Sequence, residues 1–411
     1  MNKRLIILSI CTFVFNYHVW SSNKSGNTDK NIVILFENDV HCAIDRYQKL
    51  AGLRDAIADT AYVGIVSCGD YLQGGTAGAI SQGKYVADVM KYVNYDAVTL
   101  GNHEFDYKVP RMNKLLKFLN IPVTCVNLQN SQTKKFPFAP YIIKDYGDKK
   151  IAFVGATTPT ARNTEEYSFV DNKGNEIYNL QPDSLPFLIQ KAVNNARKEG
   201  ADYVFLIAHL GEDPNDFHSD SHTIISKTYG IDAVLDGHTH SVIPCDSVLN
   251  KEGKTVLIAQ TGTKLSNIGH LFINKNGQIS INLIPIENVK QDNPIVKEKY
   301  ERMLKKSQAL TEQVIGNSEI KLLVTDDNGV KVIRQQETNG GDIVADAFWN
   351  IAKTDIAMIN AGGVRTSLKQ GTITYGKIID MLPYDNKLQI VEVNGETILR
   401  LLTECTTLLP K

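Results

Sequence analysis

The stretch Gly101-Asn102-His103-Glu104-Phe105-Asp106 decides the fold that this sequence predicts. It directly follows the apolar and β-branched run at residues 96–100, which is typical of a short buried strand. Polar side chains that come straight after such a strand lie at the carboxyl edge of a sheet, where α/β proteins place their sites. In this interpretation Asn102 faces a metal ion and His103 faces the substrate. Asp106 then holds the other imidazole nitrogen of His103, which fixes its tautomer and raises its basicity.

The same pattern, an apolar run that ends in a carboxylate or an imidazole, recurs along the first 240 residues. The runs at residues 32–36, 63–66, 203–208 and 233–235 are of the buried-strand type, and segments with helical periodicity separate most of them. A further run at residues 122–127 also predicts a strand. Alternating strands and helices indicate a layered α/β domain. The polar residues delivered at the five strand ends are Asp39, His41, Asp70, Asn102, His103, His209, His238 and His240.

These strand-end residues suit borderline divalent cations such as zinc, manganese or iron. A single strand-end Asp or His is usually a turn former or a satisfied core group. Here, however, five of the nine histidines fall at such ends, and chance does not explain that concentration. Seven potential ligands are too many for one ion but fit two ions that share a bridging carboxylate, for which Asp70 is the candidate. The remaining histidines are His18 in the N-terminal segment and three that we interpret as surface or structural groups, His218, His222 and His270.

Four acidic or thiol side chains near these ligands receive a different interpretation. Glu37 and Glu104 alternate away from the site on an extended backbone, so we expect them to be solvated or to touch the ligands from outside. Cys42 and Cys68 could coordinate zinc as thiolates, but small buried side chains behind the site are the favoured reading.

Composition narrows the functional classes. A chain of 411 residues with 43% hydrophobic and 22% charged residues is typical of a soluble globular protein with two domains. The formal net charge of −1 gives no overall attraction to nucleic acid polymers, so small substrates are favoured. After the N-terminal segment, no stretch is apolar and long enough for a membrane span.

Residues 1–21 are typical of a cleavable export signal, with a basic start at Lys3 and Arg4 and a short apolar run. We therefore expect an exported protein, periplasmic or extracellular. A lipid anchor at Cys11 is disfavoured, because Ile10 is a poor fit to the small residue expected before a lipid-modified cysteine.

Beyond the signal, three further segments are expected. Residues 31–288 form the domain that carries the strand-end ligands. Residues 293–314 are charged, periodic and free of glycine, which predicts an exposed linking helix. Residues 318–411 begin a second domain whose pattern stops before it is complete, with a predicted strand that enters a helix at residues 391–402.

The strand-end motifs resemble the secreted 5′-nucleotidase and UDP-sugar hydrolase family of calcineurin-like metallophosphatases. The resemblance covers about residues 31–288 and implies a four-layer αββα sandwich, with Tyr107-Lys108 as a small departure in one loop. It implies a His103–Asp106 dyad and two divalent metal ions that share Asp70. It also implies the two ligand sets, which are Asp39, His41, Asp70 and His240 for one ion, and Asp70, Asn102, His209 and His238 for the other.

Residues 337–347 and 360–365 resemble the start of that family's nucleotide-binding C-terminal domain. The resemblance makes Asn360 and Arg365 candidates for substrate contact. Gln336 stands where many relatives carry an arginine, and the nearby Arg334 is a candidate substitute. Tyr384 is the candidate for the first of two aromatic side chains that stack on a base in relatives, while the second lies beyond the end of this sequence. The chain is then a fragment or frameshifted product, or a separate polypeptide completes the domain.

The expected activity is hydrolysis of nucleoside 5′-monophosphates or related nucleotides by attack of a metal-bound water, with protonated His103 as a donor to the phosphoryl group or leaving oxygen. Hydrolysis of nucleotide sugars or of 2′,3′-cyclic nucleotides would use the same metals. A truncated nucleotide-binding remnant with impaired catalysis and a single-metal binding protein are the alternatives from other classes.

Overall fold

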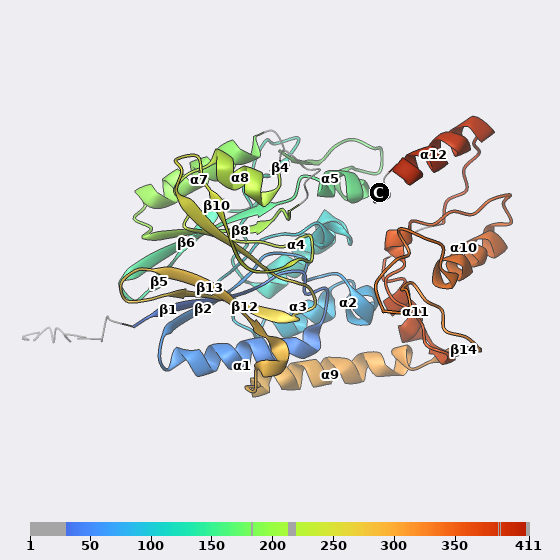
Figure 1. Cartoon of the computed structure of the whole chain (residues 1–411), viewed down its shortest axis with the longest axis horizontal. Coiled ribbons are helices and arrows are strands. Elements are labelled where there is room, and N and C mark those ends of the chain that lie inside the picture. The colour runs from blue at the N-terminus through green and yellow to red at the C-terminus, as the bar shows by residue number, and fades with distance from the viewer. Residues whose placement is uncertain (1–29, 182–183, 213–218, 385, 387, 408–411) are drawn as a thin grey trace, which may run out of the picture.

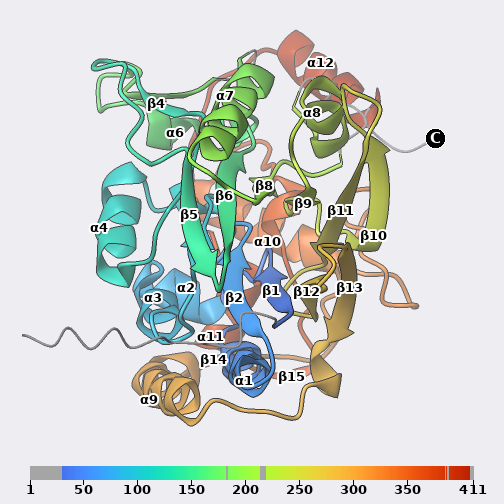
Figure 2. The same cartoon turned by 90° about the vertical axis from the view of Figure 1, so that its left-hand side faces the viewer.

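Two β-sheets packed face to face, with helices on both outer sides, form the larger part of the molecule (Figures 1 and 2). The structure is a computed structural model that describes residues 30–181, 184–212, 219–384, 386 and 388–407. The predicted export signal at residues 1–21 lies outside the described residues. The mixed α/β class and the four-layer arrangement predicted for the first part of the chain are confirmed.

The first sheet has the strand order β13-β12-β1-β2-β3, and β1 pairs in parallel with β2 but antiparallel with β12. The second sheet has the order β10-β11-β9-β8-β6-β5, in which β6, β8, β9 and β11 run parallel to one another and the edge strands β5 and β10 run antiparallel to them. Parallel strands end at one edge, so the residues that follow β1, β2, β3, β8 and β9 gather there. The bounds of the strands are β1 Ile32–Glu37, β2 Tyr62–Ser67, β3 Ala97–Val98, β5 Tyr141–Tyr146, β6 Lys149–Thr157, β8 Tyr203–His209, β9 Ala233–Leu235, β10 Val242–Leu249, β11 Thr255–Thr261, β12 Asn267–Ile273 and β13 Ile279–Pro285.

Three hydrophobic cores hold the four layers together. Alternate residues of one strand enter different cores, because successive side chains of a strand point to opposite faces. Along β1, Val33 and Leu35 pack toward the helices of the first sheet, whereas Ile34 and Phe36 pack between the two sheets. A third core lies between the second sheet and its own helices. Both faces of these strands are therefore buried, which explains why their sequences read as continuous apolar runs.

The helices follow the predicted periodicity closely, and the differences lie in short elements. The predicted strand at residues 122–127 is wrong, since that segment makes only isolated bridges at Val123 and Thr124 and the strand β4 begins later. The segment after Thr157 contains two short helices and the strand β7. The bounds of these elements are α1 Tyr47–Ala58, α2 Gly75–Ser81, α3 Lys84–Met90, α4 Val109–Leu119, β4 Leu128–Asn130, α5 Ala161–Thr164, α6 Glu166–Phe169, β7 Tyr178–Leu180, α7 Leu185–Lys198 and α8 Ser221–Lys227.

The long helix α9, Pro294–Thr311, runs along α1 and leads into the last part of the chain (Figure 1). This last part has one small core that includes Val324, Val344 and Met381. The predicted strand before the final helix is absent at residues 391–393. The bounds of its elements are β14 Val314–Ser318, α10 Asn339–Ala352, β15 Gly371–Thr374, α11 Tyr375–Met381 and α12 Gly395–Thr407.

The last part of the chain contacts the first at the start of α2. The backbone N–H of Thr76 donates a hydrogen bond of 3.0 Å to Oδ1 of Asp380 on α11, and its hydroxyl donates to the same oxygen at 2.6 Å. Gly376 lies against Thr311 of α9 at the same junction. These contacts set the position of the last part relative to the sheet edges.

Within the part of the chain that the structure describes, no helix combines the length and the apolar character that a bilayer crossing requires.

Candidate metal centre and active site

Six of the predicted ligands lie in the segments that follow their strands, and His209 is the last residue of β8. Five of them have a positive φ, which is uncommon for residues other than glycine: Asp39 at 52°, His41 at 44°, Asp70 at 60°, His238 at 84° and His240 at 59°. Such conformations cost on the order of 1–3 kcal/mol each and persist where the surroundings over-determine them. Their concentration at one sheet edge indicates a functional site.

The first group of side chains consists of Asp39, His41, Asp70 and His240. One potential ligand atom from each lies within 4.8 Å of all the others. The Nε2 atoms of His41 and His240 are 3.0 Å apart, and Nε2 of His240 lies 3.3 Å from Oδ1 of Asp39. Two imidazole nitrogens and two carboxylates that converge in this way form a donor set that suits zinc, manganese or iron.

The second group lies on the other side of Asp70. Oδ2 of Asp70 is 3.2 Å from Nε2 of His209 and 3.7 Å from Nε2 of His41, so this oxygen stands between the two groups. Oδ1 of Asn102 lies 3.3 Å from Nε2 of His209 and 3.0 Å from Nδ1 of His238. All seven predicted ligands are thus brought together, and Asp70 lies where a bridging carboxylate would.

One buried oxygen tests whether these residues fit a cation. Oδ1 of Asp39 is shielded from solvent and has no hydrogen-bond partner among the described residues, although Oδ2 of the same carboxylate accepts two hydrogen bonds. An unsatisfied buried carboxylate oxygen is costly unless a cation neutralises it. Because this oxygen faces Nε2 of His41 and His240, the arrangement fits a bound divalent cation.

The outer nitrogens of the imidazoles are fixed by backbone carbonyls. Nδ1 of His209 lies 2.7 Å from the carbonyl oxygen of Cys68, and Nδ1 of His41 lies 3.2 Å from that of Gln73. A carbonyl only accepts, so each Nδ1 carries the proton and each Nε2 offers a lone pair to a cation. Burial lowers the pKa of His41 to about 3 and that of His238 to about 4, which keeps both rings in the neutral form that ligates metals.

Two close contacts explain the glycines of the motifs. A Cβ on Gly101 would lie 2.1 Å from Oδ1 of Asp70, and one on Gly237 would lie 2.9 Å from Oδ2 of Asp39.

Cys42 and Cys68 are buried, and each thiol lies near a backbone carbonyl, which agrees with their interpretation as packing residues.

Glu104 has a positioning role that the sequence pattern did not specify. It is 1% exposed, and its two carboxylate oxygens accept four hydrogen bonds, all from backbone N–H groups. The donors are Asp70 and Gly101 at 2.7 Å, Tyr71 at 2.9 Å and Leu72 at 3.0 Å. Glu104 therefore ties the turn that carries Asp70 to the turn that carries Asn102. Its place inside the motif was the available signal, but its four partners were not visible in the sequence.

Glu37 is also fully buried, so neither glutamate is solvated, whereas the alternative of a contact with a ligand residue from outside holds for Glu104. It accepts a hydrogen bond of 2.8 Å from the hydroxyl of Tyr95. Burial raises its pKa to about 8.

His103 and Asp106 form the expected pair. Nδ1 of His103 lies 3.0 and 3.1 Å from the two carboxylate oxygens of Asp106. Although burial opposes it, Asp106 and Asp70 hold the pKa of His103 well above its ordinary value. A protonated imidazole in this position can donate a hydrogen bond to an anionic group in the cavity that it lines.

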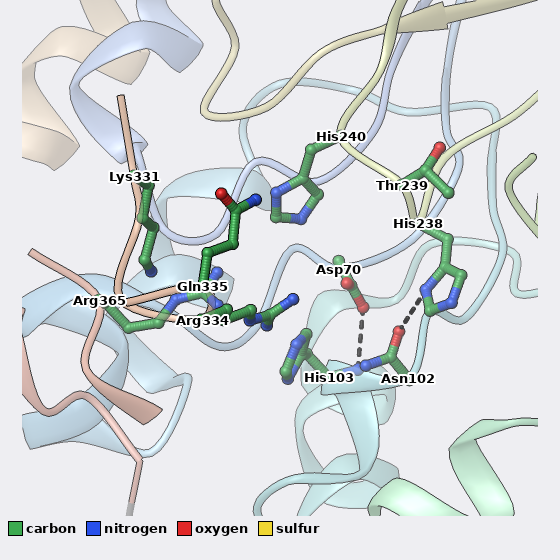
Figure 3. A pocket seen from close by; sticks show the side chains of 10 residues that line it. All are labelled: Asp70, Asn102, His103, His238, Thr239, His240, Lys331, Arg334, Gln335 and Arg365. Atoms are coloured by element: carbon green, nitrogen blue, oxygen red, sulfur yellow. Dashed lines mark hydrogen bonds between the residues drawn. The ribbon is translucent and has the colours of Figure 1, made fainter. Parts of the chain in front are cut away.

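A cavity of about 550 Å³ joins the metal-ligand edge to the last part of the chain (Figure 3). One side carries the imidazoles and Asn102. The opposite side, which we call the cationic wall, is formed by Lys331, Arg334 and Arg365. Burial, followed by the charges of Arg365 and Arg334, lowers the pKa of Lys331 to about 8. The remaining lining residues are Asp70, Thr239 and Gln335. Arg334 and Arg365 were predicted from the sequence, whereas Lys331 was not.

Tyr384 and Asn360 take different positions. The Tyr384 ring stacks on His103, with centroids 5.7 Å apart and planes at 24°, and the guanidinium of Arg365 lies 5.8 Å from the same ring. The carboxamide of Asn360 accepts a hydrogen bond of 3.0 Å from the N–H of Gly362 and is absent from the cavity lining. Its role in substrate contact stays a prediction.

Comparison with known families agrees with this architecture. The family described as Calcineurin-like phosphoesterase matches residues 32–242, and the family described as 5′-nucleotidase, C-terminal domain matches residues 314–408. The first match contains all seven predicted ligands together with His103 and Asp106.

Named relatives are distant in sequence. A 5′-nucleotidase of Vibrio parahaemolyticus is 24% identical, over 97% of this chain and 80% of its own length. The trifunctional nucleotide phosphoesterase protein YfkN of Bacillus subtilis is 23% identical over 91% of this chain, which spans only 27% of that protein. Among solved structures, a 5′-nucleotidase precursor from Thermus thermophilus matches with a TM-score of 0.77 and 23% identity, covering 92% of this chain and 78% of that one. That likeness concerns the fold.

Proposed function

The chain belongs to the calcineurin-like phosphoesterase family, and on that premise we propose that it is an exported metallophosphoesterase that hydrolyses nucleoside 5′-monophosphates. The observation that carries the proposal is the cavity of about 550 Å³, in which four of the predicted ligands and His103 face a wall of three cations. The four ligands are Asp70, Asn102, His238 and His240. A phosphate ester placed there would meet positive charge on both sides. The volume is in the range of small-molecule sites.

The roles proposed for the ligands follow from their donor atoms. Asp39, His41, Asp70 and His240 would hold one divalent cation, and Asp70, Asn102, His209 and His238 a second. Such cations, when bound, supply Lewis acidity and neutralise charge on the phosphoryl oxygens. Asn102 contributes a neutral oxygen and so adds no negative charge to repel the substrate.

His103 is the proposed proton donor. Asp106 keeps its Nδ1 engaged, so Nε2 is the nitrogen left to approach the phosphoryl group or the leaving oxygen. Donation at that position would stabilise charge that develops on the leaving group.

The cationic wall is the proposed substrate-positioning surface. Arg365 and Arg334 can pair with phosphate oxygens in a bidentate manner, and Lys331 adds a third positive charge. Tyr384, which lies between Arg365 and His103, is the proposed surface for a base or ribose, on the condition that substrate displaces one of these two neighbours. The domain limits given above remain part of the proposal.

Phosphate release after metal removal tests this function. The purified chain is chelated, supplied again with manganese or zinc, and assayed with AMP, UDP-glucose, 2′,3′-cyclic AMP and p-nitrophenyl phosphate, beside an Asp39→Asn control. We expect metal-dependent release that is fastest from AMP and absent in the control.

Each other outcome has a defined meaning. A preference for UDP-glucose or the cyclic nucleotide would replace the substrate class, and equal release from all esters would remove the nucleotide from the proposal. If no substrate is hydrolysed with either metal, the proposal fails and a nucleotide-binding remnant is favoured.

A further inference from the structure

A second group of potential metal ligands lies outside the active site. It consists of Glu212, His222 and Asp246, one ligand atom from each lying within 4.8 Å of the others. They come from three separate elements: Glu212 follows β8, His222 lies in the first turn of α8, and Asp246 lies on β10. We call these three residues the outer triad. The proposed phosphoesterase reaction uses none of them.

The imidazole of His222 points into the triad without a hydrogen-bond partner. Its Nε2 lies 3.2 Å from Oε1 of Glu212, within ion-pair range. That nitrogen is nevertheless shielded from solvent and makes no hydrogen bond to any described residue. The side chain of His222 as a whole is 41% exposed, and among the described residues Glu212 alone offers this nitrogen an ion pair, so there is room for a further partner. A cation between the imidazole and the carboxylates would be such a partner.

The charges of the triad also favour a bound cation. Glu212 and Asp246 bring two carboxylates together, and in the described ranges no lysine or arginine forms an ion pair with either of them. Burial raises the pKa of Glu212. The charge of His222 lowers this pKa, and the charges of Asp236 and Asp246 raise it. A divalent cation would relieve this repulsion, as it does in carboxylate-rich metal sites.

The backbone holds the three residues in place. The strand β10 has a bulge between Ile243 and Asp246. Ile243 pairs with Gln260 and Asp246 pairs with Ile258, so three residue steps along β10 correspond to two along β11. Such a bulge changes the direction of the side chains that follow it, here that of Asp246. On the other side, Asp220 caps α8 by accepting a hydrogen bond of 3.0 Å from the N–H of Thr223, which fixes the turn that carries His222.

We propose that the outer triad binds a third divalent cation of the borderline class, such as zinc, with a structural role. One imidazole and two carboxylates favour zinc or manganese over calcium, which prefers oxygen ligands alone. The cation would join the segment at residues 210–212, directly after β8, to α8 and β10. This segment lies beside the active site, since a Cβ on Gly211 would be 2.7 Å from Thr239 and 3.3 Å from His238. The bound cation would therefore stabilise the backbone next to His238, a predicted ligand of the active site.

Metal counting tests the proposal. The full chain, stripped with a chelator and dialysed against zinc, is analysed by mass spectrometry for zinc per chain, together with His222→Ala, Asp246→Asn and the matched control His270→Ala. His270 is a histidine on β12 that contacts Asn282 outside any candidate site. We expect both triad variants to hold one zinc fewer than the wild type and the control. We also expect zinc to raise the melting temperature of the wild type more than that of His222→Ala.

A second readout separates the triad from the active site. Cobalt replaces zinc and gives visible absorption that depends on its ligands, so the spectrum of wild type minus His222→Ala should show an additional nitrogen-containing site. Equal zinc content in all four proteins, or a difference spectrum without such bands, would overturn the proposal. Neither result bears on the phosphoesterase proposal, because the triad shares no residue with that site.

Discussion

The metal-ligand edge and the cationic wall face each other across one cavity, yet they are built in opposite ways. Asp39, Asp70 and His209 are at most 1% exposed and follow strands whose two faces are both buried. Lys331 and Arg334 are exposed and lie on loops of the last part of the chain, where the core is small. The edge is therefore over-determined by its own sheets, whereas the wall depends on how the last part of the chain sits against the first.

This difference indicates that chemistry and selectivity can be separated. A change at the edge should reduce hydrolysis of every substrate alike, because it alters the atoms that would hold the cations. A change at the wall should act mainly on substrates that reach it. A change at the contact between α2 and α11 should act on the wall without altering either set of side chains.

The largest effect is expected from Asp70→Asn. This change removes the negative charge that stands between the two ligand groups, at 3.2 Å from His209 and 3.7 Å from His41. We expect kcat to fall by about 10³-fold or more for AMP and for p-nitrophenyl phosphate alike. The control is Asp148→Asn, an exposed carboxylate beside Lys149. A loss confined to AMP would contradict the assignment of Asp70 to the common chemistry.

Glu104→Gln should weaken metal binding without removing a ligand. The amide would place a donor against backbone N–H groups that now donate to a carboxylate, which loosens the turns of Asp70 and Asn102. We expect the manganese concentration for half-maximal activity to rise by about 10–100-fold. Excess manganese should restore much of kcat. An unchanged manganese requirement, in a variant that still folds by circular dichroism, would show that Glu104 does not position the ligands.

Arg365→Ala tests the wall itself. The guanidinium lies over the Tyr384 ring and lines the cavity, so its loss removes a charged contact to a nucleotide. We expect kcat/KM for AMP to fall by about 10–100-fold, since hydrogen bonds to charged groups contribute ~1.5–3 kcal/mol. The small ester p-nitrophenyl phosphate should lose less. The control is Lys369→Ala, because Lys369 is an exposed cation outside the cavity lining. An equal loss of kcat/KM for AMP and for p-nitrophenyl phosphate would show that Arg365 acts on the chemistry shared by all substrates.

The smallest effect is expected from Asp380→Asn at the contact with Thr76. The change weakens two hydrogen bonds that hold α11 against α2 but leaves both sides of the cavity intact. We expect the ratio of kcat/KM for AMP to that for p-nitrophenyl phosphate to fall by about 5-fold, which corresponds to ~1 kcal/mol. Asp346→Asn on α10 is the control. If the ratio stays constant, the position of the wall does not depend on this contact.

The sequence predicted the edge better than the wall, for a reason that particular residues make clear. Asp39, Asp70 and His209 come immediately after apolar runs, and a parallel sheet brings the ends of such runs together whatever the loops do. No comparable pattern marks Lys331, because the residues next to it in the sequence do not indicate which surface of the protein its loop will face. The strand predicted at residues 122–127 failed for a related reason. The segment bonds in turn to Val98, Ala139 and Gly155 instead of following one neighbouring strand, and the sequence does not show which backbone it will meet.

By itself, the sequence determined the α/β class, the strand-end ligands and the pairing of His103 with Asp106, because each of these is encoded within a few neighbouring residues. Only the tertiary structure decided the four backbone partners of Glu104, the left-handed turns of the ligands, the cationic wall and the outer triad. Glu104, the cationic wall and the outer triad each involve residues more than 30 positions apart, such as Glu104 and Asp70, or Glu212 and Asp246. Local patterns of hydrophobicity fix which elements form, but the contacts between their ends exist only after the layers have packed.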